Sequence, residues 1–435
     1  MAGRTSFLCL ALWLAPVTLC AQTSPDMAKI LERLDRLEQE NRTLSEQVRA
    51  LQAQLGTPPP PPPTVEERLD VHQNRIEEQA QTKVEASQKF PIRLTGMALF
   101  NAFSNSKQSG GADYPVVAAA TGPGHSGATV RQTIIGLEYG GAPAILGGKV
   151  GGSIYMDFFA GTNNSAFRIR TASIEVDWKT RSVVAGLEKP IFNPREPSSL
   201  AQVGISPLTG AGNLWLWLPQ LRFEQEVTLT GATGFRAQIG AVQTREIGPY
   251  VGTVVPEGAR PALEGRVNFH HKLDDERRLE FAVGFHTSTT HAGGQSIPSS
   301  LYSFDWFANP WKRVEFSGVF YSGRNVAHLG SGTRQGFAIY KNYGYAIPSI
   351  GGWGQLTLHT LPRLDFHFFT GQVDDENHDL VKGSIGKNLL FGGNAYFRIA
   401  PNVLVGLEAS QVRTMILGQG VRLNNHYDLA LAYLF

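Results

Sequence analysis

Residues 425–435, NHYDLALAYLF, alternate bulky apolar side chains with polar or small ones. Successive side chains of a β-strand point to opposite faces, so this period of two predicts a strand. One face would carry Tyr427, Leu429, Leu431, Tyr433 and Phe435, and the other Asp428, Ala430, Ala432 and Leu434. The chain therefore ends on a strand with one strongly apolar face and a terminal aromatic residue.

Earlier segments alternate in the same way and place many polar groups on the second face. In residues 213–228, an apolar face with Trp215, Trp217, Leu221 and Phe223 opposes Gln220, Arg222, Glu224 and Glu226. In residues 261–272, Leu263, Val267 and Phe269 oppose Glu264, Arg266, Asn268 and His270. So many charged and amide groups on one face cannot fill a dry core, because burying them unpaired is costly. An apolar outer wall around a hydrated interior predicts a membrane barrel.

Sixteen such segments follow one another from residue 90 onward. The connections between them alternate between long and short, which is typical of outer-membrane barrels with an even number of strands. We therefore predict an all-β fold, a 16-stranded antiparallel transmembrane β-barrel over residues 90–435. The predicted strands are residues 90–103, 128–139, 145–159, 167–178, 182–192, 213–228, 234–243, 261–272, 278–288, 299–307, 312–322, 351–359, 363–371, 387–398, 402–412 and 425–435.

A secreted β-sandwich is the alternative, because it also alternates apolar and polar residues. A closed barrel is favoured, since it pairs every backbone polar group inside lipid. With 42% hydrophobic residues, 17% charged residues and 47 glycines, the composition argues against one long helical protein and against a highly charged disordered chain. The formal net charge of +2 gives no general reason to expect nucleic-acid binding.

The first 21 residues have the features of a signal peptide. A positive start with Arg4 precedes the apolar run FLCLALWLA at residues 7–15, which is too short to span a bilayer. We expect cleavage near Ala21. Lipidation at Cys20 is a weaker alternative, because Leu19 replaces the small residue expected there. Cys9 and Cys20 both lie in this segment, so the mature chain would contain no disulfide and no Cys metal site.

Residues 22–57 are predicted to form an α-helical coiled coil. Seam residues recur at alternating spacings of three and four, which creates a stripe that can be buried only against another helix. A lone amphipathic helix packed on the same chain is the alternative. Asn41 occupies an a position, where it fixes the register and by itself favours two strands. The seam comprises Ile30, Leu34, Leu37, Asn41, Leu44, Val48 and Leu51.

Two further segments precede the barrel. Six consecutive prolines at residues 58–63 predict a stiff polyproline linker. Residues 64–89 predict a second helical segment with a less regular pattern, because Val65, Leu69 and Ile76 keep only part of the heptad spacing. Pro91 disfavours helix just before it, and the pattern changes to a period of two from residue 90.

The chain resembles the DcaP-like outer-membrane porins over most of its mature length. The resemblance rests on the order of coiled coil and barrel and on FPIRLTGMALFNAF (90–103), MDFF (156–159), RIRTA (168–172), GGWGQL (351–356) and the final NHYDLALAYLF. It implies a homotrimer of 16-stranded barrels in the bacterial outer membrane, with the coiled coil in the periplasm. It also implies passive uptake of small anions, typically dicarboxylates. Because the resemblance implies three chains, we interpret Asn41 as a register device.

A porin needs a constriction that is polar, charged and narrower than the barrel. Residues 193–212 are the candidate, because this long connection is stiffened by prolines and carries Arg195 and Glu196. We expect it to fold into the lumen; an ordinary exposed loop is the alternative.

Charged residues on the polar faces of the predicted strands are the other candidates for pore lining and selectivity. Arg168 and Arg170 share their parity with the apolar Ile174, so either they lie at the rim or a β-bulge switches the parity. The barrel segment holds 29 Lys and Arg against 25 Asp and Glu, which mildly favours anions. The remaining candidates, expected to face water, are Lys149, Asp157, Arg222, Glu224, Glu226, Arg236, Glu264 and Arg266.

Other functions have less support. A carbohydrate-selective porin would need a spiral of lumen-facing aromatic residues, and a structural tether would use the rod to grip peptidoglycan. An enzyme is not predicted, because no local signature joins a histidine, including those of HTSTTH at residues 286–291, to a serine. The acidic residues 374–379 could hold Ca²⁺, but their glycine placement does not match an EF-hand, which favours a solvated loop.

The expected partners follow from this interpretation. They are a homotrimer, outer-membrane lipid and lipopolysaccharide, the barrel-assembly machinery through Phe435, and small anions, with peptidoglycan as a further candidate. We predict no cofactor, no metal site and no nucleic-acid partner.

Overall fold

The computed structural model describes residues 25–54, 92–161, 165–247, 255–333, 335–340 and 343–435. The chain divides into two units, residues 1–86 and 87–435, which are described separately. The predicted signal peptide (1–21), proline linker (58–63) and second helical segment (64–89) lie outside the described residues.

The first unit contains helix α1 (Pro25–Gln54), which covers most of the segment predicted as a coiled coil. Three of its seam side chains, Leu37, Leu44 and Val48, are 54%, 59% and 51% exposed in the single chain, and Asn41 is exposed with them. The side chains of Ile30, Leu34 and Leu51 are not among those described. The heptad face of α1 is thus open to solvent in one chain. Within the described ranges, no helix combines the length and hydropathy needed to cross a membrane.

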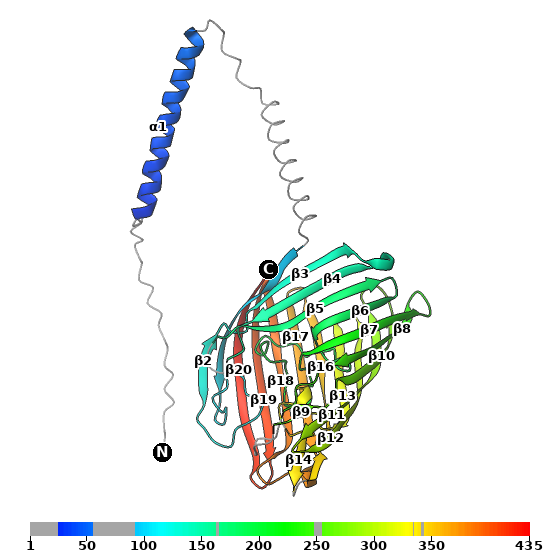
Figure 1. Cartoon of the computed structure of the whole chain (residues 1–435). Coiled ribbons are helices and arrows are strands. Elements are labelled where there is room, and N and C mark those ends of the chain that lie inside the picture. Colours follow the sequence, from blue (N-terminus) through cyan, green and yellow to red (C-terminus); the bar gives the residue numbers. More distant parts are fainter. Residues whose placement is uncertain (1–24, 55–91, 162–164, 248–254, 334, 341–342) are drawn as a thin grey trace, which may run out of the picture. The chain divides into compact units, whose positions relative to one another are not determined.

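In the described part of the second unit, sixteen antiparallel strands form a closed barrel (Figure 1), as predicted. Closure occurs where β1 pairs with β20, from Met97 opposite Leu434 to Asn105 opposite His426. The barrel strands are β1 (Ile92–Asn105), β3 (Ile134–Pro143), β4 (Lys149–Asp157), β5 (Arg168–Trp178), β6 (Arg181–Glu188), β7 (Leu218–Thr228), β8 (Thr233–Val242), β10 (Ala262–Lys272), β11 (Arg278–Ala292), β12 (Gln295–Trp311), β13 (Val314–Arg324), β16 (Pro348–Leu361), β17 (Leu364–Asp375), β18 (Ile385–Ala400), β19 (Val403–Ile416) and β20 (Gly420–Leu434).

Short elements decorate the connections. Strand β2 (His125–Thr129) pairs with the end of β1, β9 (Glu257–Gly258) pairs with β11, and β14 (Phe337–Tyr340) pairs antiparallel with β15 (Tyr343–Ala346). The described connections also contain the 3-10 turns η1 (Ile145–Gly147), η2 (Ala327–Leu329) and η3 (Asn377–Asp379).

The first and last barrel strands meet at a glycine. Gly96 N donates to Phe435 O (3.0 Å), and Phe435 N donates to Gly96 O (3.2 Å). A Cβ atom at Gly96 would lie 2.3 Å from Ile134 O and 2.8 Å from the Phe435 ring. Glycine is therefore required at this position by the close approach of β3 and of the terminal aromatic ring.

The two edges of the barrel differ in the length of their connections. The edge that holds the end of β20 has tight turns, such as residues 179–180, 312–313, 362–363 and 401–402. The opposite edge carries the long connections 106–133, 189–217, 243–261 and 325–347. This alternation agrees with the pattern expected for outer-membrane barrels.

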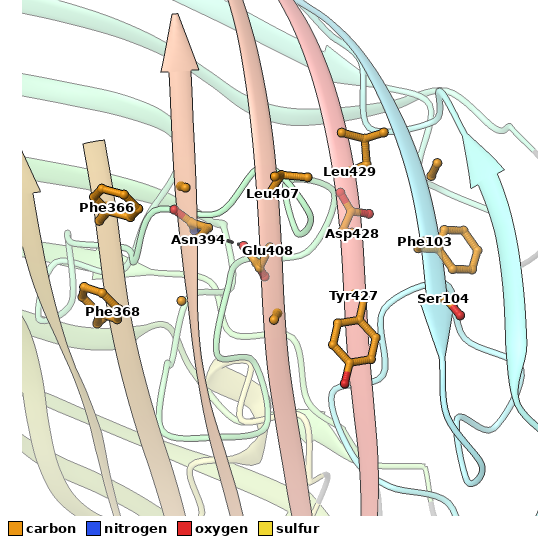
Figure 2. Close-up of a pocket in the computed structure, with 14 residues that line it drawn as sticks. Phe103, Ser104, Phe366, Phe368, Asn394, Leu407, Glu408, Tyr427, Asp428 and Leu429 are labelled. Atoms are coloured by element: carbon orange, nitrogen blue, oxygen red, sulfur yellow. Dashed lines mark hydrogen bonds between the residues drawn. The ribbon is translucent and has the colours of Figure 1, made fainter. Parts of the chain in front are cut away.

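The two faces of the wall have the predicted chemistry. On β20, Leu429, Leu431 and Tyr433 are exposed on the outer face, whereas Ala430 and Ala432 are buried inside. Over β17, β18, β19, β20 and β1, the outer wall has a shallow hollow of about 810 Å³ (Figure 2). Aromatic and leucine side chains border it: Phe366, Phe368, Leu407, Tyr427 and Leu429.

Several strands differ from their predicted bounds; β3, for example, spans Ile134–Pro143 where 128–139 was predicted, and β12 spans Gln295–Trp311 where 299–307 was predicted. The start of β7 is the difference that changes which side of the wall residues face. Residues 213–228 were expected to form a single strand with Trp215 and Trp217 on the outer face. Strand β7 instead begins at Leu218, and Trp215 is buried within the preceding connection. Both tryptophans belong to the barrel interior, because that connection turns inward.

Candidate pore constriction

Residues 189–217, which connect β6 to β7, lie inside the barrel. Almost all of them are buried or half-buried, and Leu208, Ala211 and Asn213 are fully buried. The expected inward fold of residues 193–212 agrees with this arrangement, although the inward segment is longer than predicted. We call residues 189–217 the inward loop.

The inward loop is hydrogen-bonded to many parts of the wall. Ile191 N donates to Glu264 Oε2 (2.8 Å), and Ser198 N donates to Gln355 Oε1 (2.7 Å). These partners come from strands spread around the barrel, so the inward loop extends across the lumen instead of covering one side. Its wall partners on β1, β10, β12, β16, β18 and β19 are Asn101, Glu264, Ser303, Gln355, Asn394 and Glu408.

Glycines let the backbone of the inward loop touch the wall. A Cβ atom at Gly371 of β17 would lie 2.2 Å from Ala211 O. Gly212 has a φ of +93°, and a Cβ atom there would lie 2.3 Å from Gly352 O of β16. Any larger residue at these positions would force the loop away from β16 and β17.

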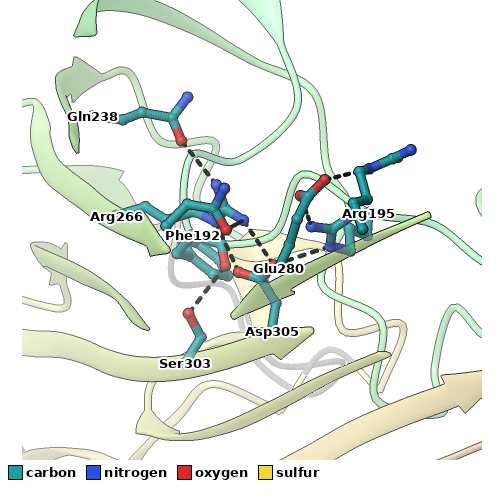
Figure 3. Close-up of polar contacts among 9 residues, drawn as sticks. Phe192, Arg195, Gln238, Arg266, Glu280, Ser303 and Asp305 are labelled. Atoms are coloured by element: carbon teal, nitrogen blue, oxygen red, sulfur yellow. Dashed lines mark hydrogen bonds and ion pairs between the residues drawn. The ribbon is translucent and has the colours of Figure 1, made fainter. Parts of the chain in front are cut away.

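A buried ion-pair network anchors the first part of the inward loop (Figure 3). Asp305 of β12 is 0% exposed and accepts from Arg195 Nε (3.1 Å) and from Arg266 Nε (2.7 Å) and Nη2 (2.8 Å). Arg195 also pairs with Glu280 of β11, and Arg278 Nε donates to Glu280 Oε1 (2.6 Å). We call these five residues the Asp305 cluster. Arg195, predicted as a selectivity residue, thus fastens the loop to the wall.

A second network contacts the middle of the inward loop. Asp157 of β4 is also 0% exposed and accepts from Arg168 Nε (2.8 Å) and Arg170 Nη1 (2.8 Å). Arg170 Nη1 also donates to Val203 O (2.7 Å), and Arg168 donates to the neighbouring Gly204 O. The two arginines therefore bridge the wall carboxylate and the loop backbone.

A β-bulge explains how these arginines face inward. Tyr155 of β4 is opposite Thr171, but the next residue, Met156, is opposite Ile169, so Arg170 is an extra residue in β5. The bulge switches the parity of the strand. Ile169 and Ile174 both lie on the exposed outer face, and Arg168 and Arg170 point inside. Of the two alternatives left open by the sequence, the structure has the bulge.

Aromatic rings and a third arginine complete this second network. The guanidinium carbons of Arg131 and Arg168 lie 4.6 and 5.6 Å from the Phe159 ring centre, and that of Arg170 lies 4.5 Å from the Trp217 ring centre. Arg131 Nη2 donates to Asp113 Oδ2 (2.9 Å). We call Asp113, Arg131, Asp157, Arg168 and Arg170 the Asp157 cluster.

The other predicted residues lie farther from the inward loop. Arg222 Nε donates to Glu224 Oε1 (2.6 Å) along β7, and Arg236 Nε of β8 donates to Glu226 Oε2 (3.1 Å). Lys149 is exposed at the first residue of β4, opposite Asp177. Lys149, Glu226 and Arg236 lie toward the edge with the tight turns, whereas Arg222 Nη1 donates to Gln220 Oε1 (3.3 Å), and Gln220 Nε2 donates to Lys189 O of the inward loop (2.7 Å).

Three of the candidates expected to face water are buried instead. Asp157, Glu264 and Arg266 are 0%, 0% and 6% exposed. Each is covered because the inward loop or an ion-pair partner occupies the space where water was expected. They therefore hold the inward loop in place, and only less buried side chains beside them can contact the lumen.

Sequence reasoning missed two further inward connections. In residues 325–347, Ala327, His328 and Leu329 are buried, and Leu216 N of the inward loop donates to Leu329 O (3.2 Å). In residues 106–133, Ala118 N donates to Thr414 Oγ1 on the opposite end of the chain (2.8 Å). The apolar stretch VAHLG at residues 326–330 was the available clue, because an exposed loop rarely needs such residues.

Tyr114, in the connection between β1 and β2, shows how these loops join the wall. Its hydroxyl donates to Glu408 Oε1 (3.4 Å). Burial, together with the nearby Glu408 carboxylate, raises the pKa of Tyr114 well above its ordinary value. Tyr114 therefore stays protonated and acts as a donor inside the barrel.

The acidic and histidine-rich stretches are engaged in ordinary pairing. Lys387 Nζ donates to Asp374 Oδ2 (2.9 Å), and Gln335 Nε2 donates to Asp375 Oδ2 (3.0 Å). His286 contacts Glu264 through Nδ1 (2.9 Å). Within the described ranges, no group of three or more His, Cys, Asp or Glu side chains is arranged to hold a metal ion.

Comparison with known proteins supports the fold. No protein-family model matches the chain, and no curated protein matches it in sequence. Among solved structures, the outer membrane channel DcaP of Acinetobacter baumannii is similar, with a TM-score of 0.67 and 16% identity over 79% of this chain and 97% of that chain. The anion-selective porin from Comamonas acidovorans follows with a TM-score of 0.57 and 12% identity, over 79% and 99% of the two chains.

A trimer form of OmpT from Vibrio cholerae is also similar, with a TM-score of 0.50 and 10% identity over 79% of this chain and 99% of that chain. At such identities the likeness concerns the fold alone. It confirms, at the level of the fold, the resemblance to DcaP-like porins: the barrel unit has the architecture of outer-membrane porins.

Proposed function

We propose that the protein is an outer-membrane porin through which small hydrophilic solutes diffuse passively, with a preference for small anions such as dicarboxylates. The lumen would be narrowed by the inward loop, and solutes would be sorted by size and by the charges beside it. The apolar outer wall supports residence in a membrane, and the polar inner wall supports a hydrated path.

The balance of charges beside the inward loop carries the proposed anion preference. The Asp305 cluster contains three arginines and two carboxylates, and so does the Asp157 cluster. Each cluster thus has one more arginine than carboxylates. Glu264 and Glu408, which accept from Ile191 N and Ser199 Oγ of the inward loop, lie outside both clusters. A fixed positive excess at a narrowing raises the local concentration of anions. The dicarboxylate preference itself comes from the resemblance to DcaP-like porins.

A carbohydrate-selective porin is less consistent with the inner wall. Stacking sugar rings needs exposed aromatic faces along the lumen. Three large inward aromatic rings, Tyr321, Trp353 and Phe369, are only 1–3% exposed, because the inward loop and its neighbours cover them. The half-buried rings of Phe159 and Trp217 are covered by the guanidinium groups of Arg131 and Arg170. These rings stabilise the loop and are not available to a sugar.

We further propose the assembly and location expected from the sequence. The chain would be exported by residues 1–21 and assemble as a homotrimer in the bacterial outer membrane. The exposed heptad face of α1 supports a coiled coil between the N-terminal segments of several copies of the chain in the periplasm. We also propose that the barrel-assembly machinery recognises Phe435. The assembled protein would contact lipopolysaccharide and peptidoglycan.

Planar-bilayer recording of the purified protein tests the function. We expect triplet conductance steps and a reversal potential of anion-preferring sign in a potassium chloride gradient. A four-carbon dicarboxylate should reduce the chloride current, whereas sucrose should not. Absence of channels would contradict the porin proposal, and equal permeability to both ions with block by sugar would contradict the anion preference.

A further inference from the structure

Asp157 and Asp305 occupy equivalent chemical settings at two different places on the barrel wall. Each carboxylate is 0% exposed and accepts hydrogen bonds from two arginines. Charge-assisted bonds of this kind are stronger than neutral ones and fix the orientation of the guanidinium plane. Each aspartate therefore determines where two arginine side chains lie.

Both pairs of arginines hold the inward loop. Arg195 is part of the loop and reaches Asp305 on β12, while Arg266 reaches the same carboxylate from β10 (Figure 3). At the other site, Arg170 and Arg168 extend from β5 and donate to Val203 O and Gly204 O. The loop is thus fastened at residue 195 and again at residues 203–204.

Removing Asp157 would take away the carboxylate that Arg168 and Arg170 share. Removing Asp305 would take away the carboxylate that Arg266 pairs with and would leave Arg195 held by Glu280 alone. Two like charges at close range in a poorly hydrated site repel each other, and an unpaired buried charge is strongly unfavourable. The arginines would regain hydration by turning toward the lumen. That movement would break their contacts with the loop.

We infer that Asp157 and Asp305 are positioning residues that hold the inward loop at two points and thereby set the width and charge of the constriction. They do not contact the permeating solute; they act through the arginines. This inference rests on the proposed porin function for its consequence in conduction, but the loop contacts can be tested independently.

A third ion pair provides a matched comparison. Glu226 of β7 pairs with Arg236 and His270, and in the described part of the chain it makes no contact with the inward loop. Its carboxylate is 25% exposed in the same barrel. The Glu226→Gln variant therefore removes one carboxylate charge from the inner wall without releasing a loop contact.

Limited proteolysis of the folded, detergent-solubilised protein tests the anchoring. Arg195 is the only Lys or Arg within residues 190–217, and Glu196 follows it, so trypsin can cut this segment at one place. We expect the parent protein and Glu226→Gln to resist cleavage after Arg195. Asp305→Asn, and the double variant with Asp157→Asn, should lose this resistance, with the fragments identified by mass.

Bilayer recordings of the same variants test the effect on the constriction. Asp157→Asn and Asp305→Asn should increase open-channel current fluctuations and change the conductance, whereas Glu226→Gln should only shift the reversal potential slightly toward anions. Protease resistance and steady currents identical to the parent in both aspartate variants would overturn the inference, even with the porin function intact.

A further variant covers the case in which an aspartate variant does not fold. Arg195→Gln removes the guanidinium group that joins the inward loop to the wall, but it leaves Asp305 paired with Arg266. It should expose Phe192 and Leu200 to chymotrypsin. Full resistance of this variant would also overturn the inference. If no protein form conducts while the proteolysis results hold, the porin function fails and the anchoring stands.

Discussion

Gly96 is a residue of the barrel wall at which there is no room for an added methyl group. It lies between Ile134 of β3 and the Phe435 ring, and the two backbone hydrogen bonds it exchanges with Phe435 close the barrel at the end of β20. The terminal aromatic ring packs there because no Cβ atom occupies the space.

The Gly96→Ala variant is expected to be less stable than the parent by about 1–3 kcal/mol, because the new methyl group forces β1 away from its neighbours. Denaturant-unfolding midpoints in detergent micelles would measure the loss. Gly140→Ala is the matched control, since nothing lies within 4 Å of a Cβ atom at that position in β3. Equal midpoints for both variants would contradict this account.

Single residues also mark what the sequence could and could not predict. Arg222, Glu224 and Arg236 face inward as the alternation indicated, because no irregularity interrupts β7 or β8. The parity of Arg168 and Arg170 was undecidable, since the bulge in β5 has no glycine or proline to mark it. Asp305 was missed, because an isolated aspartate in an alternating strand looks like any other inward polar residue.

Among the elements, η2 in residues 325–347 carries a buried histidine. His328 is 1% exposed, and its Nε2 atom lies 3.4 Å from His286 Nε2, while its Nδ1 atom lies 3.7 Å from Glu246 Oε2. Burial, with a smaller contribution from His286, lowers the pKa of His328 well below 6.5. His328 is therefore neutral in the folded protein at pH 7.

Because the unfolded chain has the higher pKa, it binds more protons below pH 6.5, and the free energy of unfolding falls as the pH drops. We expect a loss of roughly 2 kcal/mol between pH 7 and pH 5 from this residue. Unfolding midpoints at the two pH values would measure it. His328→Gln should remove this part of the pH dependence, and the exposed His378→Gln should not; identical pH slopes in all three proteins would refute the assignment.

Helix α1 is the element whose role depends on other chains. A peptide of residues 22–57 is expected to associate and to be helical, because its heptad face can be buried only against another helix and such packing supplies most of a helix's stability. Leu37→Glu places a charge on the seam and should make the peptide monomeric with little helix. Gln39→Glu adds the same charge off the seam and should change neither property. Sedimentation and circular dichroism would measure both, and a monomeric parent peptide would contradict the coiled coil.

The inward loop shows how far element-level prediction reaches. Its length and its prolines indicated an inward fold. The predicted bounds, residues 193–212, were too narrow, because the aromatic pattern of residues 213–217 continues that of β7 without a break. Residues 325–347 lie in the connection between the predicted strands 312–322 and 351–359, for which no inward fold was predicted. Their burial depends on contacts with the inward loop, such as Leu216 N to Leu329 O, which no local pattern encodes.

At the scale of the whole molecule, selectivity is expected to depend on ionic strength. Fixed charges act over about 30 Å at 0.01 M salt but only about 3 Å at 1 M. An anion preference that arises from the arginines of the two clusters should therefore weaken as salt is raised. Reversal potentials for the same concentration ratio, measured around low and high salt, would show the permeabilities converging. A constant ratio would point to size or specific binding instead of charge.

The many wall partners of the inward loop also have a consequence for biogenesis. Its contacts reach from Asn101 on the first strand to Glu408 on the penultimate one. These wall side chains are brought together only after the two ends of the sheet have joined. The narrow passage must accordingly form late, and a newly closed cylinder would first exist with an unobstructed bore.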